Sequence, residues 1–540
     1  MISEAGRFWR TVCHLKPAQF YRRLWFHLYR RRPDFLAAPA LRAIQGIWRA
    51  TAERTASLVG PTRFCFLNAE ADLIEIGWDK PQQQILWRYN QHYFDDLNAK
   101  NARNRSDWHQ ALVADWITAN PPYTGTGWAP YPTSLRIVNW IKWALAGNSL
   151  DDAARHSLAV QARWLIGRME YHLLGNHLFA NAKALVFAGL FFEGEEAQNW
   201  LNRGLAILQR EIPEQILADG AQFELSPMYH ALAVEDMLDL VNIARAYGRS
   251  DLAEIWAAPI PSMLRWLQAM SHPDDAISFF NDAAMGIAPP NRELREYAQR
   301  LEFSASYDLP ALTHLENSGY VRMEAGPFAL FSDLARIGPD YLPGHAHADT
   351  LSFELSYAGH RVFVNSGTSE YGIGTERLRQ RGTAAHNTVV VENQNSSEVW
   401  SGFRVGRRAR PHAVSVGMND DGELYAQAMH DGYRYLPGKP LITRRFELNS
   451  TRLSITDLLS SKIQAEARFH LHPQISLKIH NPNEALLTLP GGLNLRVRSE
   501  GSDMRVEDAT WHPEFGISIP NRCLIIPLVA GRANLSVEGI

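Results

Sequence analysis

The chain has 540 residues, of which 46% are hydrophobic and 21% are charged, and these fractions exclude a chain that is disordered throughout. Its 54 Lys and Arg nearly balance 57 Asp and Glu, and the net charge of -3 argues against a dedicated nucleic-acid-binding protein, which would be basic. A single hydrophobic core rarely organises more than about 300 residues, so we expect at least two domains.

Cysteine and hydropathy patterns exclude further classes. The three cysteines, Cys13, Cys65 and Cys523, lie far apart, which excludes a disulfide framework and a cysteine-based zinc or iron–sulfur site. The sequence contains no apolar run of about 18 residues, so we expect no transmembrane helix. It begins without an apolar segment followed by a small-residue cleavage site, so we predict a cytoplasmic location, with the periplasm as the alternative.

Residues 1–84 are predicted to form a helical and irregular N-terminal extension. The first 32 residues hold eight Lys and Arg against one acidic residue, and Phe20, Leu24 and Leu28 follow one another at helical spacing. This pattern favours an arginine-rich helix that docks on the rest of the protein. Binding to an anionic membrane surface is the alternative.

Helical periodicity dominates the next part of the chain, with short Gly, Asn or Pro breaks between the periodic segments. The segments predicted to be helical are 107–119, 134–147, 153–171, 177–192, 197–210, 229–247 and 251–270. Such a succession is typical of helical hairpins arranged as a toroid or a solenoid.

The hydrophobic period changes to two near residue 315, after a mixed linker at 270–317. The segments predicted to be strands are 328–335, 351–357, 361–365, 387–393, 452–457, 474–480, 485–498 and 515–529. Many short strands at regular spacing indicate a β-sandwich. The chain is therefore predicted to have a helical domain followed by a strand domain, and ligands often bind at such an interface.

A histidine-rich segment, GHAHADTLSFEL at 344–355, is the most specific motif. His345 and His347 share one face of an extended chain, and Asp349 continues that face. His386, at the start of another predicted strand, supplies a third imidazole. Such a group can bind a metal or divide acid and base roles. The alternative is a pair of histidines that cap a loop through hydrogen bonds.

Two motifs in the helical part break local rules. Asn176 and His177 stand at a predicted helix start, before an apolar run. Glu224, Tyr229 and His230 surround a Pro-containing turn before the next helix. Helix capping alone explains each motif, so neither is specific by itself.

Basic and aromatic residues suggest a ligand. The arginines between residues 375 and 410 are Arg377, Arg379, Arg381, Arg404, Arg407, Arg408 and Arg410. They suit a polyanion, and solvated strand faces explain them equally well. Trp128 and Tyr131 are candidates for stacking on sugar rings, although packing in a core explains most aromatic residues.

Four motifs together resemble the heparinase II/III family of polysaccharide lyases, which is related to oligoalginate lyases and dermatan sulfate epimerase. They are NH at 176–177, ELSPMYH at 224–230, GHAHADTLSF at 344–353 and AHNTVV at 385–390. The resemblance implies an α+β two-domain fold. An incomplete (α/α) toroid at 85–315 would precede an antiparallel β-sandwich at 316–540.

The resemblance also implies a reaction, β-elimination at a uronic acid within an anionic polysaccharide or oligosaccharide. Asn176 and His177 would neutralise the carboxylate beside C5, and Tyr229 would protonate the departing O4. Tyr229 would also be the base in a syn geometry if a cation lowered its pKa. His345 would be the partner base or would stabilise ionised Tyr229. The residues expected to bind substrate are Glu224, His230, Arg404, Trp128, Tyr131 and Arg381.

Alternatives and a cofactor remain at this stage. A C5-uronyl epimerase needs the same base and carboxylate clamp, and a non-catalytic glycan-binding protein of an exopolysaccharide pathway is a third hypothesis. By resemblance, His347, Asn365 and His386 match a structural zinc site, although Asn365 replaces the family's Asp with a neutral amide. The sequence does not predict an oligomeric state.

Overall fold

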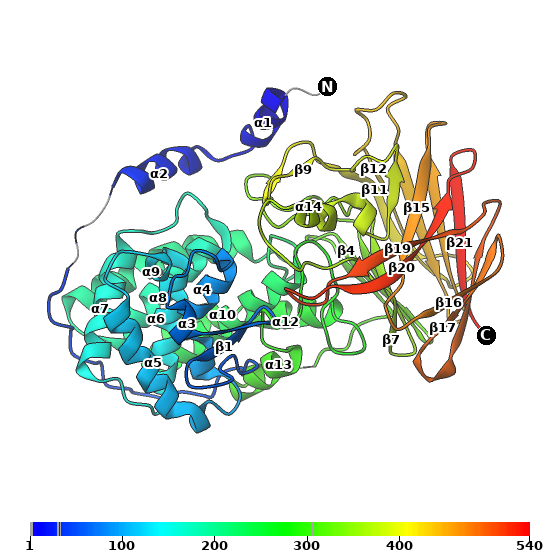
Figure 1. Ribbon diagram of the computed structural model, residues 1–540. Helices are drawn as coiled ribbons and strands as arrows, with labels where there is room; N and C mark the ends of the chain where they lie inside the picture. Colours follow the sequence, from blue (N-terminus) through cyan, green and yellow to red (C-terminus); the bar gives the residue numbers. More distant parts are fainter. Residues whose placement is uncertain (1–3, 30–31, 33, 305) are drawn as a thin grey trace.

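The computed structural model describes residues 4–29, 32, 34–304 and 306–540. Figure 1 shows a helical domain beside a strand domain, with two N-terminal helices along one edge of the molecule. These helices are α1 (Glu4–Val12) and α2 (Pro17–Leu28). The predicted α+β two-domain fold is confirmed.

The helical domain is built from consecutive helices that pack against their neighbours. Their bounds are α3 (Leu73–Ile76), α4 (Ile85–Tyr93), α5 (Ser106–Ala119), α6 (Pro130–Leu145), α7 (Asp152–Ile166), α8 (Gly175–Phe191), α9 (Glu195–Gln215), α10 (Pro227–Ala246), α11 (Ser250–Ala257), α12 (Ile260–Ala269) and α13 (Asn291–Arg300). A hairpin of β1 (Arg63–Phe66) and β2 (Ala69–Asp72) precedes them.

Helix α8 lies at the centre of this domain because its sequence is apolar on every side. It packs against α6, α7, α9 and α10. The predicted helix at 251–270 is instead two helices, α11 and α12, since Pro259 lies between them and cannot continue a helical hydrogen-bond ladder.

The strand domain contains antiparallel sheets. The strands that carry its core are β3 (Leu312–Leu315), β4 (Tyr320–Ala325), β5 (Phe328–Asp333), β6 (Phe353–Tyr357), β7 (His360–Phe363), β8 (Val389–Val391), β11 (Pro411–Met418), β12 (Leu424–His430), β13 (Ile442–Leu448), β14 (Arg452–Leu459), β15 (Ala465–His470), β16 (Ser476–Asn481), β17 (Glu484–Thr488), β18 (Asn494–Ser499), β19 (Arg505–Trp511), β20 (Ile519–Pro527) and β21 (Arg532–Gly539). A short hairpin pairs β9 (Val399–Trp400) with β10 (Arg404–Val405).

The described strands form a sandwich whose sheets share one apolar core. The largest sheet has the order β11-β12-β13-β14-β21-β18-β17-β16, and smaller sheets have the orders β3-β4-β5-β6-β7 and β19-β20-β15-β8. Buried residues of all three sheets, such as Phe353, Phe446 and Phe469, belong to the same cluster. The first strand begins at Leu312, slightly earlier than the predicted domain start at 316.

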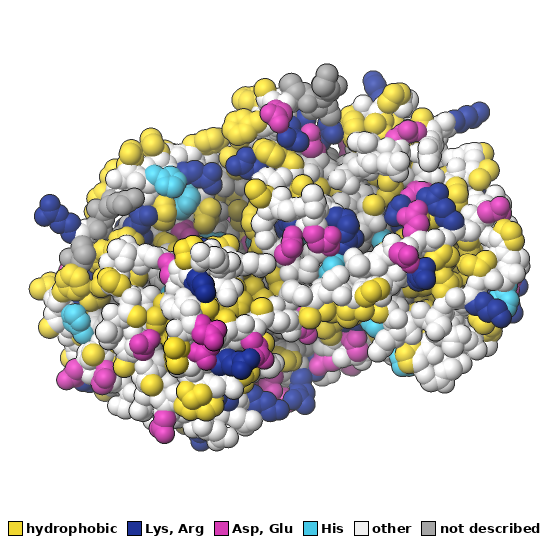
Figure 2. Space-filling model, viewed as in Figure 1, with side chains coloured by type: hydrophobic (Ala, Val, Ile, Leu, Met, Phe, Trp, Pro, Cys, Tyr) yellow, Lys and Arg dark blue, Asp and Glu magenta, His cyan; other side chains and the backbone are white. Residues whose placement is uncertain are grey.

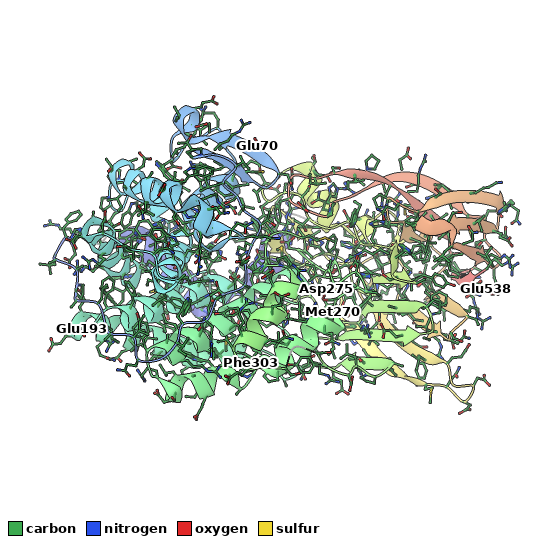
Figure 3. The ribbon with its side chains drawn as sticks, turned by 90° about the horizontal axis from the view of Figure 1, so that it is seen from below. Glu70, Glu193, Met270, Asp275, Phe303 and Glu538 are labelled. Atoms are coloured by element: carbon green, nitrogen blue, oxygen red, sulfur yellow. The ribbon has the colours of Figure 1, made fainter. Side chains whose placement is uncertain are left out.

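The two domains meet over a mixed apolar cluster. Trp266 of α12 and Phe280 of the following loop pack with Tyr320 of β4 and Phe331 of β5. Figure 3 shows the labelled Met270 and Asp275 at this junction, between the helices and the strands. Within the described part of the chain, no helix is long and apolar enough to cross a membrane.

Candidate active site

A buried carboxylate organises the junction. Asp282 is fully buried and lies in the loop between α12 and α13. Its oxygens accept hydrogen bonds from His345 Nδ1 at 2.8 Å and from His347 Nε2 at 2.8 Å. Arg377, from helix α14 (Thr375–Arg381), donates to both oxygens, with Nη2 at 2.7 Å from Oδ2. Burial would raise the pKa of Asp282, but Arg377 and the two imidazoles bring it well below its usual range. Asp282 is therefore an anion.

This contact determines which nitrogen of His345 can react. A carboxylate only accepts hydrogen bonds, so Nδ1 of His345 carries the proton that is donated to Asp282. The Nε2 atom therefore keeps its lone pair when the ring is neutral. It lies 3.6 Å from Glu224 Oε2, and the side chain is 14% exposed. His345 thus has the geometry of a base at the domain junction.

Tyr229 lies directly against His345, with their ring centroids 4.0 Å apart. It stands in the first turn of α10, where Ser226 caps the helix by accepting from the Tyr229 N–H at 3.2 Å. The hydroxyl of Ser226 donates in turn to the Asp282 backbone carbonyl. One cap therefore connects the helix that carries Tyr229 to the residue that orients His345.

The Tyr229 hydroxyl keeps its proton. It lies 3.0 Å from the hydroxyl of Tyr371. Burial, and then Tyr371 and Asp282, raise the pKa of Tyr229 well above its usual value. The nearby Arg377 interacts with this phenol but is paired with Asp282, and the pKa of Tyr229 stays raised beside it. The arrangement suits a proton donor, and it does not support the expectation that a lowered pKa lets Tyr229 act as a base.

A second histidine–carboxylate pair lies on the helical side. His177 Nδ1 is 3.3 Å from Glu170 Oε1, and the His177 side chain is 31% exposed. Burial would lower the pKa of His177, but Glu170 raises it above its usual value. Asn181 holds Glu170 in place by donating to Oε2 at 3.0 Å. Glu170 therefore favours the protonated form of His177, at an accessible position.

The start of α8 brings this pair close to the first. Gly175 has φ of 54°, and a Cβ there would lie 3.1 Å from Glu224 Oε1, the residue whose other oxygen faces His345. The half-buried Asn176 follows, and within the described residues its side-chain amide has no hydrogen-bond partner. The Tyr131 ring lies 4.5 Å from the His177 ring. The structure thus brings the predicted Asn176, His177, Tyr229, His345, Glu224 and Tyr131 to one junction.

Three of the predicted substrate-binding residues lie elsewhere, and the structure corrects them. Trp128 is buried in the helical core against Trp116. His230 is fully buried and bonds to the Met263 carbonyl at 2.9 Å through Nε2. Arg381 is fully buried and donates to the Ala346 carbonyl at 2.8 Å, so it supports the loop that carries His345.

The arginine-rich patch is also largely used within the protein. Arg377 and Arg381 are buried, and Arg408 pairs with Asp340 at 2.7 Å. Arg404 is exposed and stacks over the Trp400 ring, with its guanidinium carbon 4.8 Å from the centroid. The neighbouring Phe403 ring lies 6.0 Å from the His345 ring. Substrate binding by Arg404 therefore stays a prediction.

Comparisons with known proteins agree with this geometry. The model described as Heparinase II/III N-terminus matches residues 80–307, and the model described as Heparinase II/III-like, C-terminal matches residues 308–536. Together they cover both domains and their junction. The chain belongs to the heparinase II/III family.

Individual family members are more distant. A heparin-sulfate lyase of Bacteroides stercoris is 29% identical over 378 residues, which cover 60% of this chain and 56% of that protein. A heparin-sulfate lyase of Pedobacter heparinus is 26% identical over 297 residues, covering 51% of this chain and 43% of that protein. The chain spans about half the length of these relatives.

Solved structures of heparinase III share the fold. One has a TM-score of 0.66 at 18% identity and covers 84% of this chain and 76% of that chain. Another has a TM-score of 0.65 at 19% identity, with 86% of this chain and 80% of that chain covered.

The heparinase II/III motif histidines form a possible metal site. One ligand atom each from His347, Asp349 and His386 lies within 4.8 Å of the others. Because His347 donates from Nε2 to Asp282, its Nδ1 lone pair faces His386 Nε2 at 3.2 Å. This group fits the donor set of zinc, with two imidazole nitrogens and the Asp349 carboxylate as ligands and the Asp282 carboxylate holding His347 in place.

Asn365 does not belong to this group, which corrects the predicted ligand set. Its amide donates to the Phe279 carbonyl at 2.9 Å and accepts from the Asn387 N–H at 3.0 Å. Both groups are thus occupied by the backbone. Residues 345–349 form a loop before β6 rather than the predicted strand face, and in this loop the Asp349 carboxylate, instead of Asn365, lies near His347 and His386.

The motif analysis did not identify four residues that define the site: Asp282, Glu170, Tyr371 and Phe403. Asp282 lies in the short sequence FFNDAA at 279–284, where two polar residues follow two apolar ones, and this pattern does not indicate a functional carboxylate. Glu170 lies seven residues before His177 and faces it through a turn. No spacing rule connects these residues, because Asp282, Tyr371 and Phe403 come together only when the two domains pack, and Glu170 meets His177 only through the turn between them.

Proposed function

We propose that this protein is a polysaccharide lyase that cleaves a uronic-acid-containing polysaccharide or oligosaccharide by β-elimination. The observation that carries this proposal is the contact of Tyr229 with His345, in which a protonated phenol lies against an oriented imidazole with the ring centroids 4.0 Å apart. His177, whose protonated form is favoured by Glu170, lies near the same junction and would supply the remaining requirement of the reaction.

The first requirement is neutralisation of the uronate carboxylate. The C5 proton is only weakly acidic because an anionic carboxylate lies beside it, and charge builds up there as the proton leaves. A cationic imidazole at His177 and the free amide of Asn176 can bind that group and stabilise the developing charge. Glu170 keeps His177 charged without occupying its exposed side.

Proton transfer then divides between two residues. Nε2 of His345 takes the C5 proton, while Asp282 holds the Nδ1–H and stabilises the imidazolium that forms. The C4–O4 bond breaks as the C4–C5 double bond forms. The Tyr229 hydroxyl gives its proton to the departing O4, as its raised pKa allows.

A uronate polymer is the substrate class that this set favours. The relatives named heparin-sulfate lyases support a glycosaminoglycan. The described site contains the acidic residues Glu170, Glu224 and Asp282, and its arginines are mostly paired. We therefore expect a substrate with carboxylates and few sulfates rather than a heavily sulfated chain, because added anions would meet these carboxylates.

The test is an ultraviolet assay for the new conjugated double bond on a panel of uronate polymers, including heparosan, heparan sulfate, heparin and alginate. We expect absorbance to rise, and Tyr229→Phe to lower kcat roughly 10²–10⁴-fold. Tyr307→Phe is a matched control, because that hydroxyl bonds only to the Ser304 carbonyl outside the site.

Two outcomes would contradict the lyase proposal. Exchange of the C5 proton with solvent without new double bonds indicates a C5-uronyl epimerase. Binding of the polymers without turnover or exchange indicates a glycan-binding protein.

We also propose a structural zinc held by His347, Asp349 and His386. The ion would act as a cross-link that keeps these loops and His347 in place, and the elimination steps above belong to other residues. Elemental analysis should find about one zinc per chain, and chelation should lower the melting temperature. His386→Ala should remove both effects. A metal-free protein whose melting temperature ignores chelators would contradict this site.

A further inference from the structure

Helix α2 is packed with its apolar face outward. The buried Gln19 contacts the strand domain by donating to the Tyr341 carbonyl at 3.1 Å, and Phe26 contacts the helical domain, with its ring 4.3 Å from that of His172. The opposite side carries a stripe of exposed apolar residues. They are Phe20 at 52% exposure, Tyr21 at 57%, Leu24 at 61%, Trp25 at 56% and Leu28 at 73%.

Helical geometry makes this stripe continuous. At about 100° per residue, positions 20, 21, 24, 25 and 28 fall on one side of the helix, and positions 19 and 26 fall on the other. A helix of a globular protein normally turns its apolar stripe toward the core. In Figure 2, hydrophobic and basic side chains appear along the edge where Figure 1 places α1 and α2. Phe8 and Trp9 of α1 add exposures of 52% and 68%.

Positive charge accompanies the stripe. Arg22 and Arg23 flank it and are exposed, and among the described residues neither forms an ion pair. The first 32 residues contain eight Lys and Arg against one acidic residue. An aromatic and aliphatic stripe bordered by arginines is the pattern of a helix that lies in a membrane interface.

The two helices are held in a defined position. Arg10 of α1 donates to both Glu398 oxygens, at 2.9 and 2.8 Å, next to the β9–β10 hairpin of the strand domain. Lys16 pairs with Glu214 of the helical domain at 2.8 Å. These contacts use polar and basic groups. They leave the apolar stripe exposed to solvent rather than buried against the protein's own core.

We propose that α1 and α2 seat the protein on an anionic lipid surface. The stripe of α2 would enter the boundary between headgroups and acyl chains, and Arg22 and Arg23 would bind lipid phosphates. Charge complementarity selects this occupant, because pairing with a second copy would bring two arginine-rich segments together. This surface property goes beyond the lyase activity and is independent of it.

The experiment is co-sedimentation of the full chain with vesicles of phosphatidylcholine alone or mixed with phosphatidylglycerol. We expect binding to the mixed vesicles that is at least about tenfold stronger than to the neutral ones, and that weakens with added salt. The triple variant Leu24→Ala, Trp25→Ala and Leu28→Ala should lose about tenfold or more of this binding. Arg22→Gln with Arg23→Gln should reduce the preference for phosphatidylglycerol.

A matched control is Ile74→Ala with Ile255→Ala, which removes apolar residues exposed by 82% and 65% elsewhere on the surface. It should bind as the parent does, and the triple variant should keep the parent's circular dichroism and its turnover of soluble polymer. Equal binding to both vesicle types, or an unaffected triple variant, overturns the proposal. So does a concentration-dependent dimer in light scattering that the triple variant abolishes, since the stripe then pairs with a second copy.

Discussion

The two histidine–carboxylate pairs of the site do different work, although each joins an imidazole to a carboxylate through Nδ1. On the helical side, Glu170 forms an ion pair with His177 and raises the pKa of that imidazole. On the strand side, Asp282 is shared among His345, His347 and Arg377, with Nη2 of Arg377 at 2.7 Å.

This difference shows how surroundings assign roles to the same residue types. Arg377 already balances the charge of Asp282, so the bond to His345 mainly fixes which nitrogen carries the proton. Glu170 mainly keeps His177 charged. The Asp282–His345 pair therefore serves as an oriented base, and the Glu170–His177 pair serves as a cation for the substrate carboxylate.

The largest expected effect comes from breaking the strand-side pair at its reacting member. His345→Ala should lower kcat roughly 10²–10⁴-fold because, among the described residues of the site, its imidazole is the one that lies against the Tyr229 ring. Steady-state kinetics on the best polymer would measure it. A variant with nearly normal kcat would assign the base to another residue.

A smaller loss is expected when the orienting carboxylate is neutralised. Asp282→Asn leaves the volume unchanged but no longer requires the proton on Nδ1 of His345, so kcat should fall about 100-fold with little change in KM. Buried Arg377 also loses its counter-ion, which should cost about 3–5 kcal/mol of stability.

Thermal unfolding and kinetics together separate these two consequences. Asp282→Glu should restore part of the activity by restoring a carboxylate acceptor. A fall in activity that follows only the unfolded fraction would contradict the orienting role.

The helical-side pair is tested through pH. Glu170→Gln removes the group that raises the pKa of His177, so burial should bring that pKa down. Since the substrate carboxylate needs the protonated form, the alkaline limb of kcat/KM should move to lower pH. An unchanged alkaline limb would show that the charge of His177 is not required.

The smallest effects are expected at the periphery. Arg404→Ala should raise KM only a few-fold and mainly at low salt, because an exposed charge contributes about 0.2–1 kcal/mol. Trp128→Phe should leave KM unchanged and lower the melting temperature, because Trp128 packs in the core. A raised KM for Trp128→Phe with normal stability would reinstate it as a substrate contact.

Periodicity predicted most elements of the fold well. The apolar run after Gly175 predicts α8 almost to its ends, and alternating burial in β14 matches the period of two predicted at 452–457, whereas β13 was not predicted. The break at Pro259 was missed because the apolar periodicity continues on both sides of it. The exposed stripe of α2 shows the limit of this method, since periodicity finds an apolar face without saying where that face points.

The motifs predicted Tyr229, His345, His177 and Asn176, because those residue types break the local pattern of a helix start or a strand entry. The same reasoning placed His230 and Arg381 in the site, where buried carbonyl contacts occupy them instead. The resemblance also indicated Asn365 as a zinc ligand, since it matches the family's position. In the structure, its amide is instead bound to the backbone.

The sequence by itself determined the two-domain order, the family motifs and the chemical types of the reacting groups, because these depend on local periodicity and on neighbours along the chain. Only the tertiary structure decided that Asp282 orients His345 and that Glu170 charges His177. Asp282 and His345 are 63 residues apart in the sequence, and Glu170 and His177 are 7 residues apart. Whether each pair comes into contact, and which other residues share its carboxylate, depends on how the chain folds.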